Sequence, residues 1–76
     1  MELYDFEVLS GDEVVAAERG VLLQSPRAAW PRVIRLARRA PSKKCRIRVR
    51  ERGETIIIVG ASAALLYTDF DFPEAA

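Results

Sequence analysis

The chain has no histidine and a single cysteine, Cys45. These absences exclude an intramolecular disulfide and the cysteine–histidine ligand sets of the usual zinc sites. The four glycines are dispersed, so none has the spacing of a glycine-rich loop that cradles a phosphate. No catalytic motif is present either. We therefore expect a protein that is not an enzyme, that carries no metal or cofactor, and that resides in a reducing cytoplasm.

Long apolar runs are also absent. No stretch approaches the ~18 apolar residues of a membrane-spanning helix, and the amino terminus alternates acidic with apolar residues, unlike a signal peptide. We expect no membrane attachment. Half of the 76 residues are hydrophobic and 30% are charged, the balance of a folded globular domain. So short a chain buries on folding only ~60% of the surface that it exposes when unfolded, so its stability is marginal. Oligomerisation is one source of additional stability.

The net charge of +1 conceals a segregation of charge along the chain. Residues 1–26 carry a net charge of −5, residues 27–52 carry +10, and residues 53–76 carry −4. Such blocks predict either a dipolar molecule or faces of opposite charge that pair internally.

The first 23 residues predict a β-hairpin. Apolar and acidic side chains alternate from 3 to 9, which is typical of a strand with one buried face, here Tyr4, Phe6 and Val8. Gly11-Asp12 supplies a two-residue turn, and this turn places Val8 opposite Val15. Gly20 is expected to break the second strand or to form a bulge in it.

A helix is predicted to follow. Ser25-Pro26 is a helix-start signal, and the helix should end near Ala40, before Pro41. Pro31 predicts either a kink or a regular part that begins at the proline. The apolar stripe recurs at helical spacing through Trp30, Val33, Ile34 and Ala37. The arginines are expected on the opposite side, away from the sheet: Arg32, Arg35, Arg38 and Arg39.

Residues 45–60 predict a second hairpin. Its first strand alternates apolar residues with arginine, whereas its second strand, 55–59, offers apolar side chains to both faces. A two-residue Arg52-Gly53 loop places Ile57 and Val59 on the outer face of the sheet. A three-residue loop that begins at Glu51 places them on the inner face instead. Either register leaves aliphatic side chains on the outer face.

These elements predict an α+β fold of order ββαββ, an antiparallel four-stranded sheet with one helix on one face. Residues 61–66 predict a helical turn or a continued strand, and residues 67–72 alternate like a further strand. We expect one domain over residues 1–72 and a frayed tail at 73–76. The expected core comprises Tyr4, Phe6, Val8, Trp30, Val33, Ile34, Ile47 and Val49, with Cys45 buried beside it.

Several short motifs resemble a family of very small, uncharacterised proteobacterial proteins of ββαββ order. The motifs are Tyr4-Asp5-Phe6, Gly11-Asp12, Glu18-Arg19-Gly20, the alanine-rich helix and Val49-Arg50 with Gly53, and the likeness covers residues 3–60. The chain departs from that pattern at Arg19, where an acidic residue is usual, at Pro31, and in its shorter hairpin turn. The resemblance implies a fold but no activity. The chain is more weakly similar to HicB-type antitoxin domains, which would imply a protein partner.

Two functional hypotheses follow. The first is a protein-interaction or structural module that forms a homodimer, or binds another protein, through the outer sheet face, with the candidate interface Ile57, Val59, Arg46 and Arg48. The alternative is a nucleic-acid-binding module. Its candidate phosphate contacts are the basic side chains of the helix and the hairpin: Arg32, Arg35, Arg39, Lys43, Lys44, Arg46, Arg48 and Arg50.

Overall fold

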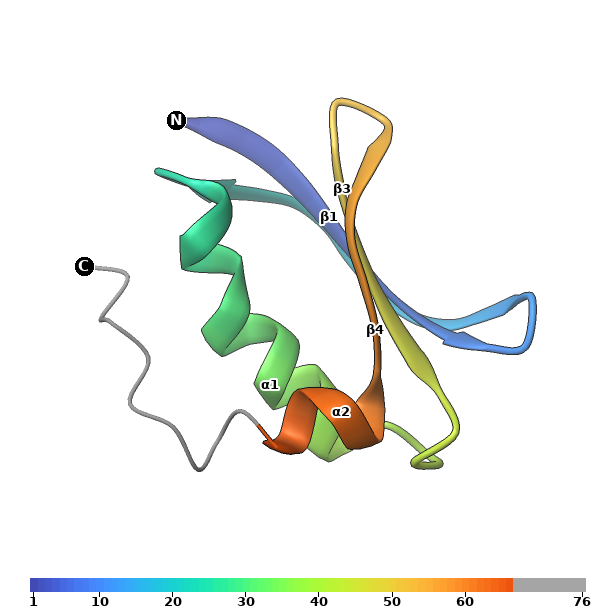
Figure 1. Cartoon of the computed structure of the whole chain (residues 1–76). Coiled ribbons are helices and arrows are strands. Elements are labelled where there is room, and N and C mark those ends of the chain that lie inside the picture. Colours follow the sequence, from blue (N-terminus) through green and yellow to red (C-terminus); the bar gives the residue numbers. More distant parts are fainter. Residues whose placement is uncertain (67–76) are drawn as a thin grey trace.

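The computed structural model describes residues 1–66. Four antiparallel strands form one sheet of order β2-β1-β3-β4, and the helices lie together on one face of it (Figure 1). The predicted α+β fold is confirmed, with a short C-terminal helix added at 61–66. The predictions for 67–72 and 73–76 lie outside the described residues. The elements are β1 (Glu2–Ser10), β2 (Glu13–Leu23), the 3₁₀ helix η1 (Pro26–Ala29), α1 (Trp30–Arg39), β3 (Arg46–Glu51), β4 (Glu54–Gly60) and α2 (Ala61–Leu66).

The β1–β2 hairpin turns at Gly11-Asp12, as predicted, and Gly11 has a φ of 61°. Its register differs from the prediction. Val8 pairs with Ala16, and Leu9 pairs with Val14, so Val15 is an extra residue on β2. The predicted pairing of Val8 with Val15 is therefore wrong, because this bulge shifts every later position of β2 by one residue.

Gly20 forms a second bulge and does not end the strand. Phe6 pairs with Glu18 and Tyr4 pairs with Val21, so Arg19 and Gly20 both lie opposite Asp5. The φ of Gly20 is 68°, a left-handed conformation that costs a residue with a Cβ atom extra energy. The Gly20 N–H donates a 2.9 Å hydrogen bond to Oδ1 of Asp5, which satisfies a backbone group that the bulge removes from the ladder.

Replacing Gly20 with alanine is expected to lower the free energy of unfolding by about 1–2 kcal/mol, because only the left-handed backbone disfavours the new methyl group. An added Cβ there would meet no heavy atom within 4 Å. The matched control is Gly60→Ala, whose Cβ would also meet nothing within 4 Å and whose φ is not positive. Urea denaturation of the two variants should show a loss for Gly20→Ala alone; equal effects would contradict the backbone explanation.

The helical segment begins irregularly because of its prolines. Pro26 begins the 3₁₀ helix η1, and Pro31 lies in the first turn of α1, where its missing N–H breaks no helical hydrogen bond. Of the two alternatives for Pro31, the regular part that begins there is the correct one. Ser25 has an extended backbone, but its side chain makes no capping hydrogen bond. Ala40 is extended, as is favoured before Pro41, and α1 ends.

The β3–β4 hairpin combines features of both predicted registers. Arg52 and Gly53 form a two-residue turn with φ values of 54° and 81°, the pattern of a type I′ turn. A bulge follows at Ile56, because Arg50 pairs with Thr55 whereas Val49 pairs with Ile57. Ile57 and Val59 therefore lie on the inner face, opposite Val49 and Ile47, and pack against the core.

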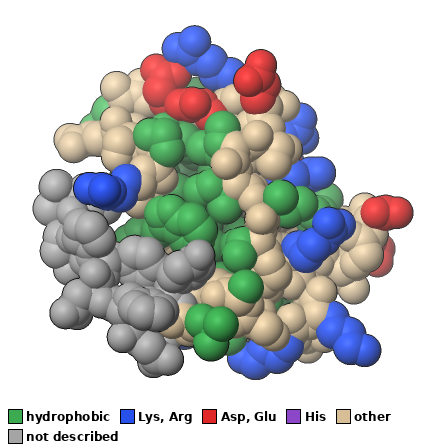
Figure 2. Space-filling view, in the orientation of Figure 1, with side chains coloured by type: hydrophobic (Ala, Val, Ile, Leu, Met, Phe, Trp, Pro, Cys, Tyr) green, Lys and Arg blue, Asp and Glu red, His purple; other side chains and the backbone are tan. Residues whose placement is uncertain are grey.

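The core fills the space between the sheet and the helices. The predicted members Tyr4, Phe6, Val8, Val33, Ile47 and Val49 belong to it, and Cys45 is buried there at 1% exposure. Trp30 packs against this cluster only partly buried, and Ile34 is buried outside it. Hydrophobic side chains also reach the surface between α1 and β4 (Figure 2). Ala37, predicted on the apolar stripe of the helix, is also in the core, whereas the prediction missed Leu36 and three further alanines, Ala29, Ala61 and Ala64.

Candidate interaction surfaces

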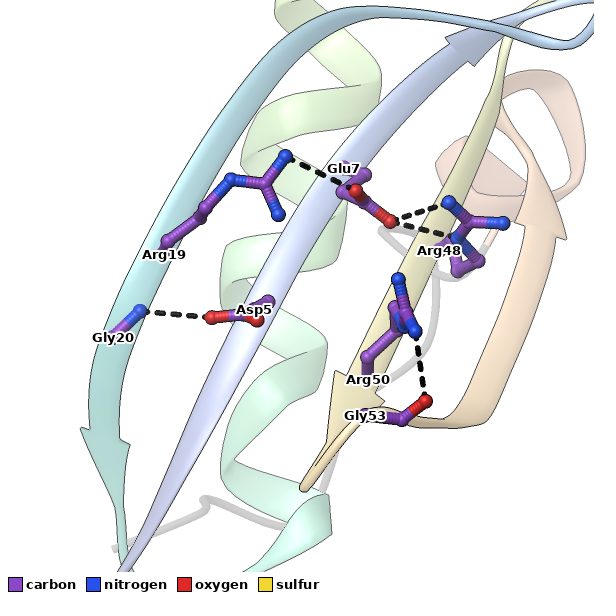
Figure 3. Close-up of polar contacts among 7 residues, drawn as sticks. All are labelled: Asp5, Glu7, Arg19, Gly20, Arg48, Arg50 and Gly53. Carbon is purple, nitrogen blue, oxygen red and sulfur yellow. Dashed lines mark hydrogen bonds and ion pairs between the residues drawn. The ribbon is translucent and has the colours of Figure 1, made fainter.

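A row of polar side chains crosses the outer face of the sheet on β2, β1 and β3 (Figure 3). At its centre, Oε1 of Glu7 accepts bonds of 2.7 Å from both Nε and Nη2 of Arg48. The other oxygen, Oε2, lies 3.2 Å from Nη2 of Arg19. Only 3% of the Glu7 side chain is exposed, so this carboxylate is a buried charge held by two arginines from neighbouring strands.

Glu7 keeps its negative charge because of these partners. Burial by itself raises the pKa of this carboxyl group, since it disfavours the charged form. The hydrogen bond and positive charge of Arg48, assisted by Arg19, outweigh burial and lower the pKa of Glu7 below its ordinary value. The centre of the outer face is therefore occupied by an ion-pair group in which Glu7 offsets one of the two arginine charges, so part of the arginine charge is not available to a partner.

Glu18 plays a similar part on the helix side of the sheet. Its Oε1 lies 2.8 Å from Nη1 of Arg32 and 3.3 Å from Nη2 of Arg35. The bond from Arg32 lowers the pKa of Glu18, and the charge of Arg35 adds to this effect. The Arg32 guanidinium also lies 5.7 Å from the centre of the Phe6 ring. The prediction that both arginines point away from the sheet is wrong, because the Val15 bulge shifts Glu18 to the inner face, opposite Phe6, where it lies toward α1.

The predicted phosphate-binding residues fall into three groups. Arg32, Arg35 and Arg48 pair with carboxylates, as described. Arg46 donates to the carbonyl oxygen of Gly11 at 3.3 Å, and Arg50 donates to that of Gly53 at 2.8 Å. Within residues 1–66, no carboxylate pairs with the remaining members, Arg39, Lys43 and Lys44. The structure thus distributes the set over the helix side and the outer face.

The predicted interface residues are divided between the two faces. Arg46 and Arg48 lie on the outer face, as expected. The placement of Ile57 and Val59 there is wrong, because the Ile56 bulge moves them to the inner face. The outer side of β4 carries Ile58, which pairs with Arg48, and the bulge residue Ile56; they are 50% and 38% exposed.

The two end strands of the sheet differ in how their edges are protected. On β2, bulges at Val15 and Gly20 interrupt the edge, and charged residues are frequent. β4 has no charged residue and no proline from Thr55 to Gly60, and its pairing with β3 is regular beyond the bulge. Natural sheets commonly protect an edge with charges, prolines or bulges, since unpaired N–H and C=O groups invite pairing with another chain. The Ile57–Gly60 edge lacks these devices.

The chain matches no protein-family model, no curated protein and no solved structure. The resemblance to small proteobacterial ββαββ proteins and to HicB-type domains therefore stays a prediction. Across residues 1–66, the structure brings together no group of three or more histidine, cysteine, aspartate or glutamate side chains that could hold a metal ion. None of the helices in this part of the chain has the length and apolar character needed to cross a lipid bilayer.

Proposed function

We propose that this chain is a small protein-interaction module that associates with a second copy of itself through β4. The observation that carries the proposal is the edge of β4, beside which residues 1–66 place no further strand, together with two exposed isoleucines, Ile56 and Ile58. One side of an antiparallel sheet is commonly polar and hydrated, so large aliphatic groups on that side gain free energy when a partner covers them.

Antiparallel pairing of two β4 strands would satisfy both features at once. A two-fold axis at Ile57 makes Ile56 a cross-strand neighbour of Ile58 from the other copy, and an axis at Ile58 pairs the two Ile58 side chains. Either register joins the two four-stranded sheets into one sheet of eight strands. It also forms hydrogen bonds between N–H and C=O groups that lie on the edge of β4 in a single copy. The guanidinium of Arg48, held by Glu7, would lie at the border of the aliphatic contact.

Replacing Ile58 with lysine is expected to convert the dimer into a monomer, because each copy would bring a charge into the centre of the contact. Light scattering on a size-exclusion column should give twice the 8.5 kDa chain mass for the unmodified protein at high micromolar concentration. The matched control is Leu22→Lys on the opposite end strand, a residue that is 59% exposed. The control should remain dimeric, and both variants should keep the unmodified circular dichroism spectrum. A monomeric unmodified protein would contradict self-association.

The alternative function, nucleic-acid binding, is supported by Arg39, Lys43 and Lys44. No carboxylate in residues 1–66 pairs with these cations, which follow one another along the end of α1 and its connection to β3. Binding through them would weaken steeply with salt, because each phosphate contact releases condensed counterions. Titration of the protein with duplex DNA and with RNA at two salt concentrations tests this alternative. Salt-sensitive binding that Lys43→Gln and Lys44→Gln abolish would favour it over self-association as the function.

A further inference from the structure

A pocket opens on the helix side of the sheet, at the edge opposite β4. It lies between β2 and the C-terminal end of α1 and has a volume of about 210 Å³. Its apolar walls are formed by Val8, Ala16, Leu36, Ala40 and Pro41. The pocket exists because two facing positions are alanines, Ala16 on β2 and Ala40 after α1. Larger side chains at these positions would fill the space.

Two charged residues lie at this pocket, and they differ in their pairing. Glu18 is already neutralised by Arg32 and Arg35. Arg39 is exposed, and no carboxylate of residues 1–66 pairs with it. In the described part of the chain, the pocket therefore combines an apolar lining with one positive charge that no carboxylate pairs. This combination suits a ligand that carries an apolar group next to a carboxylate.

The volume decides how large the apolar group can be. An apolar cavity of ~150 Å³ accommodates benzene, whereas pockets for drug-sized ligands measure roughly 300–1,000 Å³. A pocket of about 210 Å³ falls between these values and has room for one large side chain, such as leucine or phenylalanine. This volume is smaller than that of the pockets that hold drug-sized ligands.

The neighbouring strand edge favours a peptide as the source of that side chain. β2 is an end strand of the described sheet, and its residues at the pocket, Ala16 to Glu18, lie between the bulges at Val15 and Gly20. This is a short regular stretch of edge. An extended peptide laid along it would direct alternate side chains to the helix side of the sheet, where the pocket opens.

We propose that this pocket binds an extended peptide that adds as a short strand to β2, inserts one large apolar side chain, and places a carboxylate at Arg39. The carboxylate comes from the peptide's C-terminus or from an acidic side chain next to the apolar residue. The site is separate from β4, which lies at the other edge of the sheet, so it does not depend on self-association.

Nuclear magnetic resonance of the ¹⁵N-labelled full chain tests this proposal. The probe is an acetylated pentapeptide of four threonines followed by leucine with a free carboxylate. Changes in the amide chemical shifts of the protein on addition of this peptide should concentrate at Ala16–Glu18 and at Leu36–Ala40. Two further probes end in a C-terminal amide instead of a carboxylate. One has the same five residues, and the other also has an aspartate next to the leucine. The amide probe without aspartate should bind about fivefold more weakly than the free-carboxylate probe. If the aspartate does not restore the affinity, the carboxylate at Arg39 is that of the peptide's C-terminus; if it does, the carboxylate is that of an acidic side chain.

Matched variants locate the two parts of the site. Arg39→Gln should weaken binding of the free-carboxylate probe about fivefold. The same change at Arg38, the neighbouring exposed arginine, should leave binding unchanged. Ala16→Leu should fill the pocket and weaken binding at least tenfold, whereas Ala63→Leu on the exposed side of α2 should not. The absence of shifts with all three probes at millimolar concentration would overturn the proposal, as would equal effects of the Arg38 and Arg39 variants.

Discussion

Phe6→Ala is expected to lower the free energy of unfolding by about 3–5 kcal/mol. Phe6 is fully buried, lies on one of the two central strands, and has the guanidinium of Arg32 over its ring. Its removal would leave a cavity between sheet and helix that the neighbouring strands cannot close, because both are hydrogen-bonded to β1. A domain of 76 residues has a total stability of about 4–11 kcal/mol, so the variant loses a large share of it and is largely unfolded at the lower end of that range.

Urea denaturation followed by circular dichroism measures this loss. The matched control is Leu3→Ala on the same strand, whose side chain is 57% exposed on the outer face and should matter little. Ile34→Ala offers a graded comparison. Ile34 is buried but lies outside the main cluster, so its cost should fall near the lower end of about 2–5 kcal/mol. A Phe6→Ala protein as stable as Leu3→Ala would contradict the assignment of the core.

The second large effect is expected for Glu7→Gln, which should cost about 1.5–3 kcal/mol at neutral pH. The amide keeps the shape of the side chain but loses the charge that binds Arg48 and Arg19. Glu13→Gln is the matched control, since Glu13 is exposed on β2 and forms no ion pair within residues 1–66. Thermal and urea denaturation at neutral pH should separate the two variants.

The same substitution should reduce the acid sensitivity of the protein. The pKa of Glu7 is lowered in the folded state, so as the pH falls the unfolded chain takes up this proton first. The stabilisation from Glu7 is therefore present above the ordinary glutamate pKa of about 4.3 and is lost as the pH falls through the lower folded value. Glu7→Gln removes this contribution but keeps that of Glu18, whose pKa is also lowered. An unchanged stability profile below pH ~4.3 would contradict the argument.

The sequence by itself determined those features that depend on local periodicity and backbone preference. Alternation at Tyr4, Phe6 and Val8 fixed the inner face of β1, because successive side chains of a strand point to opposite faces. Ile47 and Val49 did the same for β3. Gly11-Asp12 located the first turn. Pro31 limited where the regular helix begins, since an α-helix tolerates proline only in its first turn. These rules use neighbours along the chain, and they were sufficient for the order of elements and most of the core.

Only the tertiary structure decided the faces of the two end strands. Each bulge, at Val15, Gly20 and Ile56, adds one residue and so exchanges inner and outer positions beyond it. Ile57 moved into the core in this way, and Glu18 came to face α1. In the run from Ile56 to Val59 every side chain suits either face, so local pattern cannot choose between them. The choice depends on hydrogen-bond register with the adjacent strand and on packing against the helices, which are contacts between distant parts of the chain.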